Sequence, residues 1–181
     1  MIFHKTTLPG AFVIEAKKLP DDRGFFARSW CVNEFKAQGL NSRLVQCNIS
    51  YNKKKLTLRG MHYQISPFAE AKVVRCTRGA IYDVIIDIRR TSATRTQWIG
   101  VELNDRNRNM LYVPEGFAHG FLTLENDTEV FYQMSEFYSP DHARTIRWND
   151  PLFNVNWPSR PRVMSTKDEE VPDCILENLG E

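Results

Sequence analysis

The sequence predicts an all-β fold, either a sandwich or a barrel. Several short segments alternate apolar and polar residues, and this period of two places successive side chains on opposite faces of a strand. Turn-forming residues separate the segments at short intervals. Helical periodicity is sparse. Many short strands joined by regular turns favour a sandwich or a barrel.

The segment Ala80–Arg89 is the clearest predicted strand. Its even positions from Tyr82 to Ile88 are apolar and form one fully apolar face, whereas Asp83 and Asp87 lie on the other face. Val130–Tyr138 alternates in the same way. Shorter strand candidates are Leu44–Tyr51, Lys72–Thr77, Gln97–Leu103 and Arg144–Trp148. The turns between strands are predicted at Arg78-Gly79, Asn104-Asp105, Pro114-Glu115-Gly116, Asn126-Asp127 and Ser139-Pro140-Asp141.

One short helix is predicted at Asn33–Gln38, with Asn33 as its N-cap and Gly39 just beyond its end. From about Trp157 onward the chain is richer in proline and polar residues, and we expect this part to wrap the surface. No repeat or linker divides the sequence, so a single domain is expected over residues 1–181.

The composition excludes several classes of protein. Of the 181 residues, 42% are hydrophobic and 25% are charged, as in ordinary globular proteins. A net charge of +2 without a dominant basic block argues against a nucleic-acid-binding protein. No apolar stretch approaches the roughly 20 residues that span a membrane, and the N-terminus lacks the pattern of a signal peptide. We therefore expect a cytoplasmic protein whose cysteines are free thiols packed as small hydrophobic side chains: Cys31, Cys47, Cys76 and Cys174.

Reactive side chains are concentrated in three segments: Arg59–Gln64, Pro114–Gly120 and the strand that contains Tyr132. His62 is a candidate general base because an imidazole titrates near neutral pH, although a partly buried structural histidine fits the spacing equally well. Tyr132 on an apolar face is, taken alone, more typical of a core tyrosine with a bonded hydroxyl.

A metal site is the first alternative for these histidines. The pattern Pro-x-Gly-x-x-His at Pro114–His119 resembles the second motif of cupin barrels, many of which bind metal. The first motif of those barrels supplies His-x-His, whereas this chain has His62-Tyr63-Gln64. Metal sites generally need three or four converging ligands. We therefore expect no metal.

Arg59, Lys72 and Arg23 together have the charge to neutralise a diphosphate, although each taken alone is more typical of a surface charge. Arg59 and His62 are three positions apart, so in a regular strand their side chains would point to opposite faces. Gly60 lies between them, and a glycine inside a strand often marks a bulge. If both residues serve one pocket, the backbone near Gly60 is expected to be irregular.

Eight stretches of the chain resemble, in order, the dTDP-4-dehydrorhamnose 3,5-epimerase family of cupin-fold sugar-nucleotide enzymes. They are Asp22–Phe26, Gln46–Ser50, Leu58–Gln64, Lys72–Cys76, Asp83–Asp87, Pro114–Phe121, Trp148–Pro151 and Ser165–Asp168. The resemblance runs from about residue 3 to beyond residue 168. It implies a cupin-type jelly-roll barrel with a few short peripheral helices, a homodimer and no cofactor.

The resemblance also implies roles for individual residues. His62 would be the catalytic base, Tyr132 the acid, and Asp168 the carboxylate that orients the imidazole. Asp83 would contact a site residue without contacting the substrate itself. The implied substrate contacts are Arg59, Lys72, Arg23 and His119 for the diphosphate and sugar, Gln46, Asn48 and Phe26 for the nucleoside, Lys167 at the rim and Tyr138 in the sugar pocket.

The implied reaction inverts C3, C5 or both in a nucleotide-linked 4-keto-6-deoxyhexose, within deoxysugar or O-antigen synthesis. Hydrogens next to the ketone are acidic because the carbanion delocalises as an enolate, so a base on one ring face and an acid on the other suffice. Two rivals from other classes are a metal-dependent cupin oxygenase or isomerase and a non-catalytic carbohydrate-binding cupin.

Two positions depart from the family pattern: Arg28 and Ala143 replace glutamates that the family associates with the nucleoside. A carboxylate accepts a hydrogen bond from the N3–H of thymine, whereas an arginine only donates. Cytosine offers acceptors at N3 and O2. We therefore also consider a CDP-linked substrate, with Arg28 as a nucleoside contact.

Overall fold

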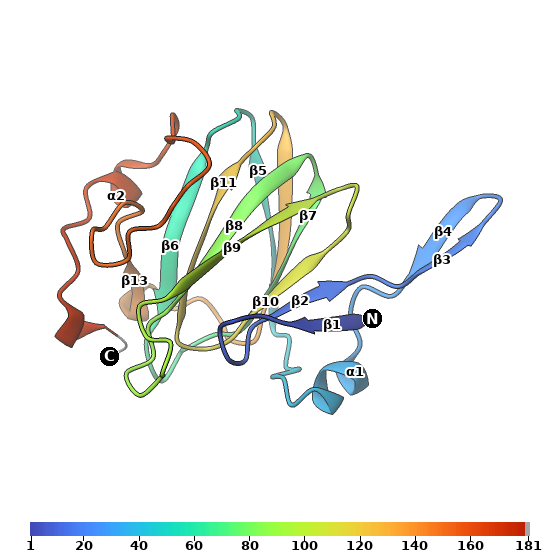
Figure 1. The fold of residues 1–181 in the computed structure, drawn as a ribbon, viewed down its shortest axis with the longest axis horizontal. Helices are drawn as coiled ribbons and strands as arrows, with labels where there is room; N and C mark the ends of the chain where they lie inside the picture. The colour runs from blue at the N-terminus through green and yellow to red at the C-terminus, as the bar shows by residue number, and fades with distance from the viewer. Residues whose placement is uncertain (180–181) are drawn as a thin grey trace.

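Two antiparallel β-sheets face each other in the computed structural model, which describes residues 1–179 (Figure 1). The six-stranded sheet has the order β1 (Ile2–Lys5), β2 (Phe12–Glu15), β10 (Met110–Val113), β7 (Lys72–Arg78), β12 (Thr128–Met134) and β5 (Gln46–Asn52). The five-stranded sheet has the order β13 (Ala143–Thr145), β6 (Leu58–Gln64), β11 (Phe117–Thr123), β8 (Ala80–Asp87) and β9 (Trp98–Asn104). Within each sheet, strands that lie side by side are often far apart in the sequence, as expected of a jelly roll.

A separate hairpin, β3 (Lys18–Asp21) and β4 (Gly24–Ala27), extends away from both sheets (Figure 1). Helices are few and short: α1 (Val32–Ala37), α2 (Thr166–Glu169), and the 3-10 turns η1 (Pro140–His142) and η2 (Leu176–Asn178). Residues 158–179 lie beside β6 and β13, so they cover the surface as expected (Figure 1).

All six predicted strands are present, with ends that differ by a few residues. The largest differences are β12, which ends at Met134 and not at Tyr138, and β13, which covers Ala143–Thr145. Seven strands were not predicted. Five of them, β1 to β4 and β10, have only four residues each, too few to establish an alternation. The other two, β6 and β11, have seven residues each, and a glycine interrupts the pattern in both. The expected N-cap was wrong: Cys31 is the N-cap of α1, with extended backbone, and Asn33 lies inside the first turn. Gly39 follows the helix with φ +71°, as its predicted terminating position requires.

The two sheets share a core to which both contribute. Val74 and Val130 come from one sheet and Ile81, Ile85 and Phe121 from the other. The opposite face of β8 is also buried, because Val84 and Ile86 pack in a second cluster against the C-terminal segment. Both faces of β8 are thus covered, including the face that carries its two aspartates.

Each buried aspartate of β8 is held by specific partners. Asp83 bonds to His119, and Asp87 accepts bonds from Arg89, Ser92 and Thr94. Burial alone would raise the pKa of Asp87, but these hydrogen bonds outweigh it and lower that pKa to about 2. Asp87 therefore remains a carboxylate in the folded protein.

The four cysteines are free thiols. Cys76 packs in the core as expected, whereas Cys47 is exposed on β5. Within residues 1–179 no helix has both the length and the hydrophobicity needed to cross a membrane.

The backbone of β6 is irregular at Gly60, as the sequence predicted. His62 lies opposite His119 and Arg59 opposite Phe121, so three steps along β6 match two along β11. Gly60 has φ +129° and is followed by a cis peptide bond to Met61. A Cβ atom on Gly60 would lie 2.5 Å from the Cα of Gly120, so the two strands approach each other through two glycines.

Replacing Gly60 with alanine tests this close approach. Gly60→Ala combines an unfavourable φ with a backbone clash, and we expect it to lower the free energy of unfolding by ~3 kcal/mol or more. Gly24→Ala is the matched control, because Gly24 has φ +131° and open space around its would-be Cβ. Urea unfolding of both variants makes the comparison. Equal stability of the two would contradict the packing argument.

Candidate active site

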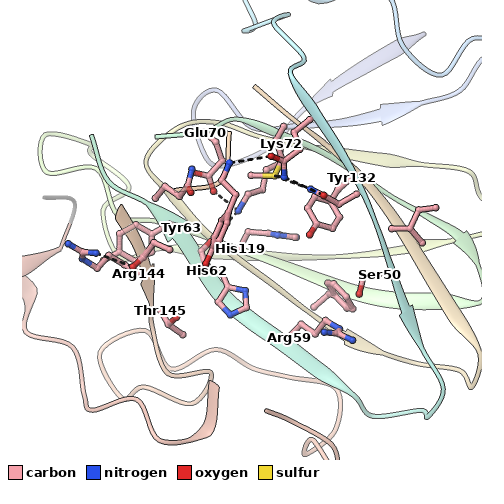
Figure 2. A pocket seen from close by; sticks show the side chains of 18 of the residues that line it. Ser50, Arg59, His62, Tyr63, Glu70, Lys72, His119, Tyr132, Arg144 and Thr145 are labelled. Carbon is pink, nitrogen blue, oxygen red and sulfur yellow. Dashed lines mark hydrogen bonds and ion pairs between the residues drawn. The ribbon is translucent and has the colours of Figure 1, made fainter. Parts of the chain in front are cut away.

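A cavity of about 550 Å³ opens between the two sheets. Its walls come from β5, β6, β7, β11, β12 and β13, and α2 contributes at the edge. The volume is in the range of small-molecule sites. The lining includes the candidate base His62 and the candidate acid Tyr132 (Figure 2).

His62 is oriented by Asp168. The Nε2 atom of His62 lies 2.7 Å from Oδ1 of Asp168. The His62 side chain is 44% exposed and that of Asp168 only 6%. Asp168 belongs to α2, whose N-cap Ser165 accepts a hydrogen bond from the Asp168 amide. Burial would raise the pKa of Asp168, but the hydrogen bond from His62 and the charge of that ring lower it, so the carboxylate stays ionised.

A second histidine–carboxylate pair lies beside the first. His119 on β11 is directly opposite His62 on β6, and its Nε2 is 2.7 Å from Oδ1 of Asp83. This pair is far more buried, since the His119 side chain is 10% exposed and Asp83 is inaccessible. Oδ2 of Asp83 has no hydrogen-bond partner among the residues described. The accessible imidazole of the two is therefore His62.

Tyr132 reaches the same cavity from the other sheet. It lies on β12, whereas His62 lies on β6 of the five-stranded sheet, so the phenol and the imidazole line one space from opposite walls. Tyr132 also packs against the shared core, as its apolar surroundings in the sequence indicated. Burial raises the pKa of Tyr132 above its ordinary value, and the positive charge of Arg59 opposes this shift only in part.

The predicted cations occupy different environments in the cavity wall. Arg59 is exposed, and its Nε donates to Asn52 over 2.7 Å. Lys72 is buried, forms an ion pair with Glu70 at 2.8 Å and donates to the His62 carbonyl over 3.4 Å. The bulge at Gly60 is what lets Arg59 and His62 share the cavity.

Four further predicted residues line the cavity. Gln46 and Asn48 come from β5, where their side chains bond to each other over 3.3 Å. The backbone N–H of Tyr138 donates to Gln46, and the exposed Lys167 precedes Asp168 at the edge. All of these predicted contacts are thus within one pocket.

Three of the predicted substrate contacts lie outside the cavity lining. Arg23 and Phe26 are on the β3–β4 hairpin, where Arg23 pairs with Asp21 and Phe26 is 69% exposed. Arg28 follows the hairpin and pairs with Glu34 at 2.7 Å. The hairpin projects from the body of the chain (Figure 1), and none of these three side chains lines the cavity.

Some lining residues were missed in the sequence. Ser50 continues the inward face of β5 two residues beyond Asn48, so strand alternation alone would have found it. Arg144 and Thr145 enter through β13, whose pairing with β6 no local signal reveals. Glu70 was missed because it precedes its strand.

The arrangement is suited to proton transfer. Within residues 1–179 no cluster of three or more histidine, cysteine or acidic side chains is placed to hold a metal ion. A carboxylate-oriented imidazole and a protonated phenol can remove a proton on one side of a bound molecule and return one on the other.

Comparison with known proteins identifies the relatives of this chain. The family profile described as dTDP-4-dehydrorhamnose 3,5-epimerase matches residues 5–175. The enzyme of that name from Sinorhizobium fredii is 40% identical over 178 residues, covering 97% of this chain and 91% of the relative. The one from Shigella flexneri is 42% identical over 165 residues, 91% of each chain.

Solved structures agree in fold. The dTDP-4-dehydrorhamnose 3,5-epimerase of Bacillus anthracis, with TDP and PPi bound, superposes with a TM-score of 0.92 at 39% identity, covering 96% of this chain and 99% of the other. The Legionella pneumophila dTDP-6-deoxy-D-glucose-3,5-epimerase, in complex with dTDP-4-keto-L-rhamnose, has a TM-score of 0.86 at 36% identity over 92% and 89% of the chains.

Titration of Tyr132 tests the electrostatics of the cavity. We expect its phenol to deprotonate above the ordinary value of about 10, because burial disfavours the phenolate. Arg59→Met should raise the pKa of Tyr132 further, since the arginine charge lowers it. NMR of tyrosine labelled at the ring carbon bearing the hydroxyl measures this, with Tyr132→Phe assigning the signal. A midpoint below 10 would refute the expectation.

Proposed function

The chain belongs to the dTDP-4-dehydrorhamnose 3,5-epimerase family, and from this premise we propose that His62 and Tyr132 perform the two proton transfers of its reaction. The enzyme is an isomerase of the cupin jelly-roll fold that epimerises a dTDP-linked 4-keto-6-deoxyhexose at C3 and C5. The observation that carries the proposal is that these two side chains enter one cavity from opposite sheets.

His62 is the proposed base. One of its ring nitrogens is bonded to Asp168, so the other is available to take the proton next to the ketone. The buried carboxylate keeps one tautomer and stabilises the imidazolium that forms. The electron pair of the broken C–H bond moves onto the C4 oxygen as an enolate.

Tyr132 is the proposed acid. Return of a proton from the face opposite the base inverts the carbon, and a phenol on the facing sheet is on that side. Because burial raises the pKa of Tyr132, the phenol is protonated when the enolate forms. Donors on the cavity wall, Lys72 and His119, stabilise the negative enolate oxygen, with Asp83 holding the ring of His119.

Arg59 is the proposed diphosphate ligand inside the cavity, since its guanidinium is exposed there and an arginine fork matches phosphate oxygens. Gln46 and Asn48 offer neutral donors and acceptors for the nucleotide, Tyr138 an exposed ring and Lys167 a charge at the rim. Supporting this, all of them lie within the same lining as the catalytic pair.

A dTDP-linked substrate is favoured over the CDP alternative. The CDP hypothesis needed Arg28 as a free donor, but its guanidinium is paired with Glu34. The relatives from Sinorhizobium fredii and Shigella flexneri are named for dTDP sugars. The naming of the relatives as epimerases also argues against the oxygenase and carbohydrate-binding alternatives.

We propose that the enzyme works as a homodimer in which the β3–β4 hairpin completes the site of the partner copy. Arg23 and Phe26 are the predicted ligands that the chain cannot deliver to its own cavity. The hairpin exposes Leu19, Phe25 and Phe26, and such apolar side chains on a projecting arm favour burial against another surface. Ile49 and Tyr51 of β5, which are exposed and line the cavity, offer an apolar surface for such side chains.

We further propose a cytoplasmic location, which the free thiols support.

Solvent deuterium exchange tests the proton-transfer roles. Incubating the enzyme with the dTDP- and CDP-linked 4-keto-6-deoxyglucose in D₂O should introduce label at C3 and C5, seen by NMR, with the dTDP form preferred. His62→Ala should slow exchange by roughly 10²–10⁴-fold, as expected for loss of a general base. Tyr132→Phe should retain exchange at C3 but fail to invert.

The matched control is His4→Ala, because His4 is an exposed histidine on β1 that pairs with Glu15 away from the cavity. It should exchange at the wild-type rate. Label at neither carbon with either nucleotide, or wild-type exchange in His62→Ala, would overturn the assignment.

Mixing two inactive variants tests the shared site. One variant carries His62→Ala and the other Arg23→Ala with Phe26→Ala. In a mixed dimer, the intact pocket of the second receives the intact hairpin of the first, so random exchange of subunits should restore about a quarter of the wild-type sites by simple counting of combinations. A hairpin that serves its own chain, or a monomer, would restore none.

A further inference from the structure

Glu70 is a buried acidic residue in the cavity wall to which neither the sequence pattern nor the relatives assign a role. Its Oε1 atom lies 2.8 Å from Nζ of Lys72, and the two side chains are 3% and 8% exposed. Figure 2 shows this pair at one end of the cavity, with His119 and Tyr132 next to it. Lys72 also donates to the backbone carbonyl of His62. The ion pair is therefore linked to the strand that carries the base.

Glu70 is a costly residue to bury. Its second carboxylate oxygen, Oε2, has no hydrogen-bond partner within the described part of the chain. A buried ion pair rarely stabilises a fold more than a well-packed apolar pair would, because desolvation offsets the attraction. Stability alone is thus a weak reason for this pair, and its position on the cavity wall indicates an effect on what binds there.

Lys72 differs from the other cations of the lining. Arg59, Arg144 and Lys167 have no carboxylate partner among residues 1–179, whereas the charge of Lys72 is compensated by Glu70. An uncompensated cation attracts a phosphate group strongly, and a compensated one does so much less. The positive charge available to an anionic ligand is therefore unevenly distributed over the wall.

Lys72 and Arg59 lie at opposite ends of the cavity. Lys72 pairs in register with Met134, and Met134 with Gln46, which places the ion pair at the first residue of β5. Arg59 bonds to Asn52, the last residue of β5. Six residues of strand separate these levels, roughly 20 Å at 3.3 Å per residue.

We propose that Glu70 determines which part of the substrate lies against Lys72. Its carboxylate compensates the charge of the ammonium, so the diphosphate is left to the uncompensated cations. Lys72 then meets a hexose oxygen that is uncharged in the bound substrate, the C4 carbonyl oxygen on which the enolate charge later develops. An ammonium has three donors, and two of those of Lys72 are used by Glu70 and the His62 carbonyl. The third is available to the sugar. The inference rests on the proposed function and makes Glu70 a positioning and specificity residue.

Anion binding to a charge-neutral variant tests the inference. Glu70→Gln keeps the shape of the side chain and leaves Lys72 uncompensated, so an anion should bind there. We expect inorganic phosphate to bind Glu70→Gln at least about ten-fold more tightly than the wild type, measured by calorimetry and as competitive inhibition of epimerisation. The double variant Glu70→Gln/Lys72→Met should lose this gain, because the ammonium is gone.

The matched control is Glu129→Gln. Glu129 is a half-buried carboxylate on β12 that accepts a hydrogen bond from Thr77 and lies outside the cavity lining, so its replacement should leave phosphate binding unchanged. Unchanged phosphate affinity in Glu70→Gln, or a gain that persists in the double variant, would overturn the inference. Because calorimetry needs no turnover, this outcome is distinct from failure of the proposed reaction, which the wild-type exchange experiment reports.

Discussion

The close approach of β6 and β11 at Gly60 and Gly120 is the constraint on which the site depends. In a regular strand Arg59 and His62 would face opposite sides, and the extra residue of β6 brings both into one cavity. The same contact sets His62 opposite His119, so two histidine–carboxylate pairs lie side by side. Only small residues permit this approach, because a Cβ on Gly60 would overlap the backbone of Gly120.

Pairing of charges gives the cavity its chemistry. Asp168 bonds to His62, and the lowered pKa of Asp168 keeps its carboxylate charged. Burial has the opposite effect on Tyr132, whose pKa is raised so that the phenol keeps its proton. Their surroundings thus suit these two side chains to the proposed roles of base and acid. Glu70 extends the same principle to substrate position, since it compensates Lys72 and leaves other cations for the diphosphate.

Local sequence patterns predicted much of the fold. The alternation in Ala80–Arg89 and Val130–Tyr138 corresponds to β8 and β12 within the two sheets. The irregularity at Gly60 was also predicted, because Arg59 and His62 have opposite parity and can share a pocket only if the strand between them is irregular. Strands β1 to β4 and β10 were not predicted, since four residues are too few to show a period, and β6 and β11 were missed because a glycine interrupts each. The N-cap of α1 was also wrong, since Cys31 makes no side-chain capping bond.

The sequence by itself determined the strand-rich class, the family resemblance and most residue types of the site, because these follow from local periodicity and from motifs. Tertiary structure decided which of them meet. Pairing between strands that are distant in sequence brought the β12 phenol and the β6 imidazole to one cavity, a short C-terminal helix supplied Asp168, and the hairpin carried Arg23 and Phe26 away from their own pocket. The ion pair between Glu70 and Lys72 was likewise visible only in the tertiary structure. Such contacts depend on the distance between side chains in space. That distance is set by the register of the sheets and by the reversals of the chain, which no local pattern encodes.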